Sequence, residues 1–299
     1  MRHVHTLNNS GKNIEYTIIG EGKPILILHG GHSNCHEEFG YAELIKAGYS
    51  LITPSRPGYG RTSPEWGSSL EEASKAYEIL LDYLGLENIN VIAISAGGPS
   101  GIHFAAKYPE RVKSLVLQSA VTKEWLTPKD KEYKAAHILF RPKAEKYVWK
   151  MIGFMSNLFP KFIFKQMLSS FSHIKGNEIW SHICKSDIES FKKMNNRQRS
   201  GTGFVIDIKQ TNEIKQEHLK AIQCPVLILH SKNDSAVSVE HAKHAAKHIS
   251  HAKLELLDSW GHLIWIGKGS EEMNKKLTDF LTDQTGSHKE SVAVRNISK

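Results

Sequence analysis

The sequence predicts an α/β protein: a mostly parallel sheet flanked by helices, with an inserted helical cap. Two observations predict this fold. Short apolar runs typical of buried strands alternate with amphipathic helical stretches over 1–122 and again over 207–283, which produces βαβ units. Between them, residues 123–206 show helical periodicity without clean strands. We therefore expect a core of 1–122 and 207–283, a cap of 123–206 and a disordered tail of 284–299.

The elements of the first core region follow in order. Asn8-Asn9-Ser10-Gly11 is a turn sequence, so the flanking strands should pair as a hairpin. Ser69, followed three residues later by Glu72, predicts a helix start. The expected strands are 2–7, 14–19, 25–28, 49–53, 89–94 and 112–118, and the expected helices are 36–47, one ending near 84, and 96–107. The second region continues with strands 225–230 and 254–257 and a helix that begins near 238.

The run Val91 to Gly98 contains a small-x-Ser-x-Gly pattern at the end of a predicted strand. Ala93 occupies the first small position, Ser95 is the serine and Gly97 follows. Small residues are needed where a sharp strand-to-helix turn holds a hydroxyl out of the backbone. The helix start after this turn leaves the Ala96 N–H free to bind a developing oxyanion.

An acid and a histidine follow two later strands. Asp234 comes after the strand 225–230, and His262 comes after 254–257. Because catalytic groups of open parallel sheets gather at the carboxyl ends of strands, we expect Ser95, Asp234 and His262 to meet. Asp258 is the competing acid, but it lies only four residues before His262.

With the order serine, acid, histidine, the chain resembles the α/β-hydrolases over 1–122 and 207–282. The resemblance implies a catalytic triad of Ser95, Asp234 and His262, with Gly31 in the His-Gly-Gly loop joining Ala96 in the oxyanion hole. It implies no metal and no organic cofactor. A helical cap after the strand 112–118 is also usual in capped members.

A serine nucleophile favours acyl chemistry, so we expect a serine hydrolase, of the carboxylesterase or lipase-like type, acting on a small-molecule acyl substrate through an acyl-enzyme. Three alternatives remain open on the same triad: an acyltransferase, a carbon–carbon hydrolase, and a ligand-binding signalling protein with a retained triad.

One loop departs from the family pattern. Arg56-Pro57-Gly58-Tyr59-Gly60 resembles the family's Pro-Gly-x-Gly loop, but Ser55 stands where an acid usually precedes it.

The expected cap has its own surface chemistry. Its 84 residues contain 16 Lys and Arg against 7 Asp and Glu, and 13 of the 26 aromatic residues. We expect its apolar faces to pack on the sheet and line an acyl pocket, with Phe154 and Phe159 as lining residues and the lysines as a solvated outer face. The alternative is that the basic cap contacts an anionic membrane. No recognition motif accompanies the charge, so we expect no nucleic-acid partner.

The remaining features are ordinary. The first residues lack the apolar core of a signal peptide, and the three cysteines have no metal-like spacing, so we expect a cytoplasmic protein.

A second pattern is a set of four histidines that fall on one predicted helix face: His241, His244, His248 and His251. We expect this face to be solvated rather than to bind a metal. The oligomeric state does not follow from the sequence.

Overall fold

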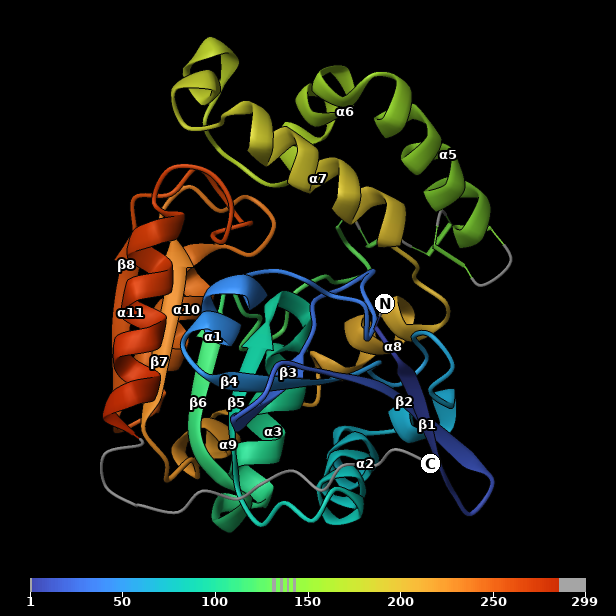
Figure 1. Cartoon of the computed structure of the whole chain (residues 1–299), viewed down its shortest axis with the longest axis vertical. Coiled ribbons are helices and arrows are strands. Elements are labelled where there is room, and N and C mark those ends of the chain that lie inside the picture. Colours follow the sequence, from blue (N-terminus) through green and yellow to red (C-terminus); the bar gives the residue numbers. More distant parts are fainter. Residues whose placement is uncertain (1, 131–132, 135–136, 139, 142–143, 285–299) are drawn as a thin grey trace.

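An eight-stranded sheet runs through the centre of the molecule in the order β1-β2-β4-β3-β5-β6-β7-β8 (Figure 1). The structure is a computed structural model and describes residues 2–130, 133–134, 137–138, 140–141 and 144–284. The strands are β1 (Val4–Asn9), β2 (Lys12–Ile19), β3 (Lys23–Leu28), β4 (Tyr49–Pro54), β5 (Ile89–Ile94), β6 (Val112–Gln118), β7 (Val226–Ser231) and β8 (Ala252–Leu257). The expected disordered tail lies, apart from Gln284, outside the described residues.

The predicted mostly parallel sheet is confirmed. The pairs β1–β2 and β2–β4 are antiparallel, and every other neighbouring pair of the sheet, from β4–β3 across to β7–β8, is parallel. Ile92 of β5 pairs with Ile27 of β3 on one side and with Val116 of β6 on the other. Such β-branched residues are buried on both faces, which explains why the central strands read as continuous apolar runs.

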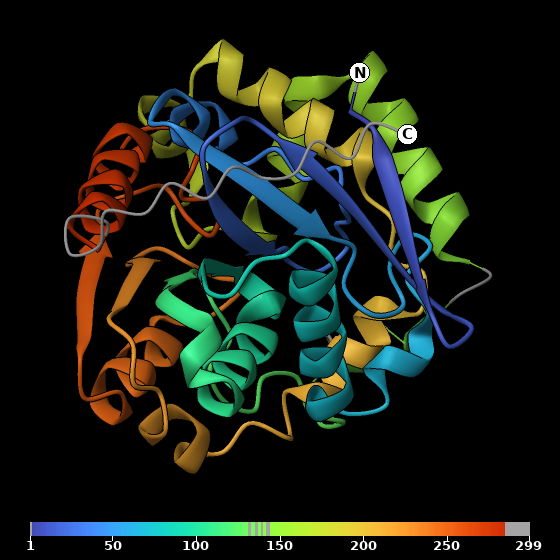
Figure 2. The same ribbon diagram turned by 60° about the horizontal axis from the view of Figure 1, so that its bottom comes forward.

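Helices cover both faces of the sheet. α2 (Leu70–Tyr83), α3 (Gly98–Lys107), α9 (Gln216–Lys220) and α10 (Val239–His248) pack on one face, and α1 (Tyr41–Lys46) and α11 (Ser270–Asp283) pack on the other. Figure 2 shows α2 and α3 side by side under the strands. The Ser69 hydroxyl accepts a hydrogen bond from the Glu72 amide and caps α2, as its sequence predicts.

Helices also fill the chain between β6 and β7. In the described residues, and ahead of α9, they are α5 (Glu145–Leu158), α6 (Pro160–Met167), α7 (Lys185–Arg197) and α8 (Gly203–Gln210). We call residues 123–206 the helical insertion; α5, α6 and α7 form its layer at the top of Figure 1. Its Phe164, Phe191 and Met194 pack in the same apolar cluster as Trp260 and Ile264 of the core. In the described ranges, no helix has both the length and the apolar character needed to cross a bilayer.

Candidate active site

The turn after β5 holds Ser95 in a backbone conformation that few L-residues adopt. Its φ is +51°, in the left-handed region. The chain passes from β5 through a 3-10 turn, Ser95–Gly97, directly into α3. A Cβ added at Gly97 would lie 2.3 Å from the Leu28 carbonyl oxygen, so a side chain cannot fit there. The small residues of the pattern therefore allow a strained turn that presents the Ser95 hydroxyl at the strand end.

Ser95, His262 and Asp234 form one continuous hydrogen-bonded chain. Ser95 Oγ lies 2.9 Å from His262 Nε2, and His262 Nδ1 lies 2.8 Å from Asp234 Oδ2. Because an ionised carboxylate only accepts, the Nδ1 of His262 carries the ring proton, and its Nε2 is left to accept from the serine hydroxyl. The three residues are 9%, 5% and 2% exposed. The structure thus brings together the three residues whose order in the sequence suggested a triad.

The Asp234 carboxylate is fixed by its own loop and by a second histidine. Its Oδ1 accepts hydrogen bonds from the Ala236 and Val237 amides at 2.9 and 2.8 Å. His230 Nε2 lies 2.8 Å from the Val237 carbonyl oxygen and 3.3 Å from Asp234 Oδ2. A carbonyl oxygen only accepts, so this Nε2 carries a proton that lies between two acceptors. The competing acid, Asp258, is exposed, whereas the three residues of this network are buried.

The helical insertion contacts the triad loops directly. The His262 amide donates to the Phe171 carbonyl oxygen at 2.8 Å, and the His173 amide donates to the Asn233 carbonyl oxygen at 2.9 Å. A Cβ added at Gly261 would lie 2.3 Å from that same Phe171 oxygen. The sequence analysis missed Phe171, although the glycine before His262 was a sign that another backbone passes close by.

Gly31 and Ala96, the two residues predicted to form an oxyanion hole, lie beside each other close to Ser95. A Cβ added at Gly31 would lie 3.6 Å from the Ala96 Cβ, and one added at Gly30 would lie 3.2 Å from the Ser95 Cβ. Within the described part of the chain, no acceptor takes a hydrogen bond from the Gly31 amide. The arrangement can therefore offer backbone N–H groups to negative charge that develops beside Ser95.

His29 supports this loop and does not act as an acid or base. Its Nε2 accepts a hydrogen bond from the Arg56 amide at 2.9 Å, so the proton lies on Nδ1, which donates to the Gly30 carbonyl oxygen at 2.8 Å. Burial, followed by the nearby Arg56 charge, lowers the pKa of His29 well below its usual value. His29 thus remains neutral and links the Gly30 backbone to the Arg56 loop.

Arg56 joins the loop of residues 29–32, which carries Gly31 and which we call the oxyanion loop, to α8. Its guanidinium makes a two-point ion pair with Asp207 of α8, with Nη2 2.7 Å from Oδ2, and its Nε donates to the His29 carbonyl oxygen at 2.6 Å. Tyr59 also donates to Asp207, at 2.6 Å. Burial opposes the charge of Arg56, but the Asp207 carboxylate outweighs burial and raises the pKa of Arg56. Sequence analysis missed Asp207, an acid inside the apolar run Phe204-Val205-Ile206-Asp207-Ile208, which is the pattern of a paired buried charge.

The missing acid of the Pro-Gly-x-Gly loop is supplied from a neighbouring strand. Ser55 donates to Glu15 Oε2 of β2 at 2.7 Å, and the Arg61 amide and Nε donate to the same carboxylate at 3.1 and 2.7 Å. Gly60, with φ of +54°, lies against this carboxylate, where a Cβ would be only 1.9 Å from Oε2. Glu15 therefore holds the loop in place of an acid at position 55.

Aromatic residues of the insertion cover the oxyanion loop. His32 lies with its ring centroid 3.9 Å from that of Phe204 and 5.0 Å from that of Trp149. Its Nδ1 and the Trp149 indole both meet Ser200 Oγ, at 2.7 and 2.8 Å. A Cβ added at Gly31 would lie 3.0 Å from the Phe204 ring, so this ring forms the wall beside the oxyanion loop.

Phe154 and Phe159, which we expected to line the acyl pocket, lie elsewhere. They are 60% and 53% exposed, so the structure places them on the solvent side of α5 and at its end rather than in an enclosed pocket. The side of α5 that faces the protein carries other residues, namely Glu145, Trp149, Gly153 and Ser156. These four do not form an apolar pattern, so the apolar residues of α5 do not mark its buried side.

The histidine face of α10 is also only partly as expected. His241 is 4% exposed, and its Nδ1 accepts a hydrogen bond from the Thr122 amide at 3.1 Å, so the expectation of a solvated face is wrong at this position. His244 reaches the same threonine, whereas His251 lies beyond the end of α10 and is exposed, so it does not share the predicted helix face. No group of three or more potential metal ligands is present among the residues that the structure describes.

Comparison with known proteins gives one family. The sequence model of the alpha/beta hydrolase fold matches residues 23–268. The chain is 57% identical over 280 residues, covering 94% of this chain and 99% of the relative, to the uncharacterized hydrolase YcgS of Bacillus subtilis (strain 168). It is 23% identical to a 2-hydroxy-6-oxononadienedioate/2-hydroxy-6-oxononatrienedioate hydrolase of Comamonas testosteroni, covering 93% of this chain and 95% of that protein. Its fold is similar to that of an alpha/beta hydrolase fold protein from Nakamurella multipartita, with a TM-score of 0.81, 25% identity and coverage of 95% and 100%.

Proposed function

The chain belongs to the alpha/beta hydrolase fold family, and from this premise we propose that it is a serine hydrolase that cleaves an ester or related acyl substrate through an acyl-enzyme. The observation that carries the proposal is the hydrogen-bonded chain from Asp234 through His262 to Ser95 Oγ. In this arrangement the imidazole lies within hydrogen-bond reach of both the serine hydroxyl and the carboxylate, as nucleophilic catalysis by a triad needs.

The proposed steps follow from these positions. His262 Nε2 takes the Ser95 proton while Oγ attacks the substrate carbonyl, and the Gly31 and Ala96 amides bind the oxyanion of the tetrahedral intermediate. Asp234 stabilises the imidazolium. His262 then returns the proton to the leaving alkoxide, which departs as an alcohol and leaves an acyl group on Ser95. Water, deprotonated by His262, attacks this acyl group and releases a carboxylic acid, while the proton returns to Ser95.

The walls of the site favour an apolar acyl group. Phe204 lies against Gly31, and the Phe171 ring is stacked with its centroid 6.3 Å from that of His262. Apolar walls cannot pair with a charged acyl chain, so a neutral substrate avoids leaving a charge without a partner. We further propose that the helical insertion acts as a cap, because its residues supply both rings.

A carbon–carbon hydrolase is the second candidate, and the Comamonas testosteroni relative favours it. Its named substrate, a 2-hydroxy-6-oxo dienedioate, carries a carboxylate at each end. The one buried guanidinium identified beside the oxyanion loop, that of Arg56, is already paired with Asp207. This pairing is the reason to place ester cleavage first.

Serine labelling and turnover test the proposal together. We expect the wild-type protein to react with a fluorophosphonate probe and to turn over p-nitrophenyl esters, and Ser95→Ala to lose both, with kcat reduced by about 10⁴-fold or more. Ser100→Ala is a matched control, because Ser100 is also a buried serine, five residues later on α3. Retention of more than about a tenth of the activity by Ser95→Ala, against the 10⁴-fold loss typical of such nucleophiles, would rule out Ser95 as the nucleophile.

The substrate panel separates the candidates. A higher kcat/KM on 2-hydroxy-6-oxo dienoates than on esters would favour carbon–carbon cleavage. Transfer of the acyl group to an added alcohol faster than to water would indicate an acyltransferase. Stoichiometric release of p-nitrophenol followed by no turnover would indicate a ligand-binding protein with a retained triad.

A further inference from the structure

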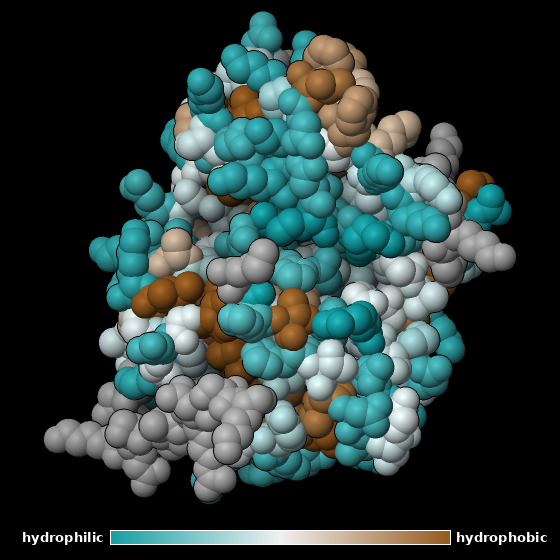
Figure 3. Space-filling model, turned by 45° about the vertical axis from the view of Figure 1, so that its right-hand side comes forward, coloured by the Kyte–Doolittle hydropathy of each residue, from teal (hydrophilic) through white to brown (hydrophobic). Residues whose placement is uncertain are grey.

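The outer surface of α5 and α6 exposes large apolar side chains. In the space-filling view of Figure 3, hydrophobic side chains gather at the top of the molecule, over the helical insertion. On α5, α6 and the residue between them, six large aromatic or aliphatic side chains are between 53% and 65% exposed: Tyr147, Met151, Phe154, Leu158, Phe159 and Phe162. We call these six residues the apolar ridge. Isolated exposed hydrophobic residues are common, but a contiguous group of this kind marks an interaction surface.

The apolar ridge follows the helix period and points away from the protein. Tyr147, Met151, Phe154 and Leu158 are spaced by four, three and four residues, so they form one stripe along α5. The opposite side of α5, with Glu145, Trp149 and Ser156, is the buried one. The amphipathic pattern of α5 is therefore reversed from that of a helix that packs on a core, and its apolar side has no partner in the described chain.

Lysines flank the apolar ridge. Lys146 and Lys150 of α5 and Lys161 and Lys165 of α6 are all exposed. None of the four has an acidic side chain within ion-pair distance in the part of the chain that the structure describes. The one acid in the two helices, Glu145, is buried and pairs with Arg199 at 2.9 Å. The surface therefore combines apolar side chains with uncompensated positive charge.

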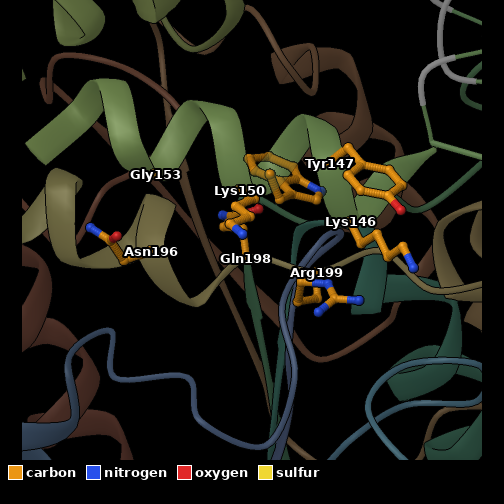
Figure 4. Close-up of a pocket in the computed structure, with 8 residues that line it drawn as sticks. Lys146, Tyr147, Lys150, Gly153, Asn196, Gln198 and Arg199 are labelled. Atoms are coloured by element: carbon orange, nitrogen blue, oxygen red, sulfur yellow. The ribbon is translucent and has the colours of Figure 1, made fainter. Parts of the chain in front are cut away.

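A pocket of about 480 Å³ opens beside the apolar ridge. Figure 4 shows Lys146 and Lys150 of α5 on one side of it and Gln198 and Arg199, which follow α7, on the other. Glu145 offsets the charge of Arg199, and the two lysines supply the rest of the positive charge. Ammonium, guanidinium and amide N–H groups are the donors that a phosphodiester anion accepts from.

We propose that this face docks the protein on an anionic phospholipid membrane, with the apolar ridge entering the acyl boundary and a lipid phosphate held in the pocket. Lysine stems lie along the apolar surface while their ammonium groups meet headgroups, the arrangement of interfacial helices. A second copy of the chain fits this face less well, because two such surfaces would bring the same lysines together. This inference replaces our expectation that the apolar side of α5 packs inward and that its lysines are merely solvated.

Vesicle flotation tests the proposal without requiring substrate turnover. Ser95→Ala protein should float with phosphatidylcholine vesicles that contain phosphatidylglycerol, float poorly with pure phosphatidylcholine, and dissociate as salt is raised. Lys146→Gln/Lys150→Gln should weaken binding roughly 30-fold, from the usual contribution of juxtamembrane lysines. Phe154→Ser/Leu158→Ser should weaken it on both lipid compositions. Because these four side chains are exposed, the variants should keep the fold, which circular dichroism checks.

A charge-matched control uses lysines away from this face. Lys75→Gln/Lys113→Gln removes two exposed lysines from α2 and from the start of β6, and it should bind like the parent. Equal loss in the control, no flotation at low salt, or equal binding to both vesicle types would overturn the proposal. Two further outcomes would also overturn it. If the protein self-associates in sedimentation and Phe154→Ser/Leu158→Ser abolishes this, a second copy covers the apolar ridge. If inorganic phosphate releases the protein from vesicles and sodium chloride at the same ionic strength does not, the pocket serves a soluble phosphate. None of these outcomes bears on the hydrolase proposal.

Discussion

Asp234 shows how much of a site depends on the surroundings of one side chain. Its Oδ1 is held by two backbone amides and its Oδ2 receives His262. With its oxygens held in this way, the carboxylate cannot rotate away from the imidazole. His230, 3.3 Å from Oδ2, closes the remaining side. Asp258, by contrast, is exposed.

We expect Asp234→Asn to lower kcat for ester hydrolysis by about 10⁴-fold, the loss seen when the triad aspartate of a serine protease becomes asparagine. An amide nitrogen facing His262 would favour the tautomer with its proton on Nε2, which cannot accept from Ser95. Asp258→Asn should lose less than about threefold, as surface changes usually do. Steady-state kinetics measure both. A larger loss from Asp258→Asn would reassign the acid, and Ser95→Ala/Asp234→Asn should be no slower than Ser95→Ala, because the triad acts as a unit.

The three residues of the hydrogen-bonded chain could be predicted from the sequence, but the residues that support them could not. Ser95, Asp234 and His262 could be predicted because each follows a strand, and parallel strands end at one edge of the sheet. Their supporting groups, such as His230 and Phe171, could not, since they depend on how distant loops cross. Phe154 and Phe159 could not be placed either, because apolar residues of an amphipathic helix usually face the core, whereas these two are 60% and 53% exposed.

Among the elements, the loop after β4 and helix α8 are linked by the Arg56–Asp207 ion pair. Both side chains are about 1–2% exposed, and the same guanidinium binds the His29 carbonyl oxygen. Through this contact, a helix more than 140 residues later in the chain fixes the loop that carries Gly31. The pair also explains why α8 buries an aspartate between Phe204 and Ile208.

Removing one partner of this pair should be costly, whereas removing both should cost less. We expect Arg56→Met and Asp207→Leu each to lower the free energy of unfolding by about 3–5 kcal/mol, because each leaves a buried charge without its counter-charge. Arg56→Met/Asp207→Leu should lose clearly less than the sum of the two. Urea denaturation at pH 7 measures all three, and Lys46→Met, in an exposed ion pair with Glu43, serves as the control. Strictly additive losses would show that the pair does not act as a unit.

The strands could be predicted from apolar runs to within about two residues, because central strands buried on both faces contain little else. Helix α1 is shorter than predicted and begins at Tyr41 instead of His36. Side chains replace helical hydrogen bonds in that stretch: Glu37 accepts from the Ser33 hydroxyl and from the Glu38 amide, and Asn34 accepts from the His36 amide. Competition of this kind between polar side chains and a helix leaves only a weak signal in the sequence.

At the scale of the whole molecule, the surroundings of four of the histidines favour the neutral imidazole. His29, His32, His230 and His241 each have a pKa lowered mainly by burial, and for His32 and His241 it falls to about 3. They lie in the oxyanion loop, in β7 beside Asp234, and in α10. The fold around the site is therefore built on imidazoles that must stay uncharged.

This distribution predicts that the protein loses stability between pH 7 and pH 5. A histidine whose pKa is about 6.5 when unfolded and about 3 when folded contributes fully above pH 6.5 and loses its contribution as the pH falls, because only the unfolded chain then takes up the proton. The loss by pH 5 is about 2 kcal/mol of unfolding free energy for each such histidine. Carboxyl groups with ordinary pKa values near 4 change little in this window.

Urea denaturation of His241→Asn, whose amide oxygen can still accept from Thr122, should therefore show a smaller loss of unfolding free energy between pH 7 and pH 5 than the parent, by about 2 kcal/mol. The exposed His251→Asn should retain the parental loss. If His241→Asn also retained it, His241 would have to take up protons in the folded and unfolded states alike, which its buried position beside Lys123 opposes.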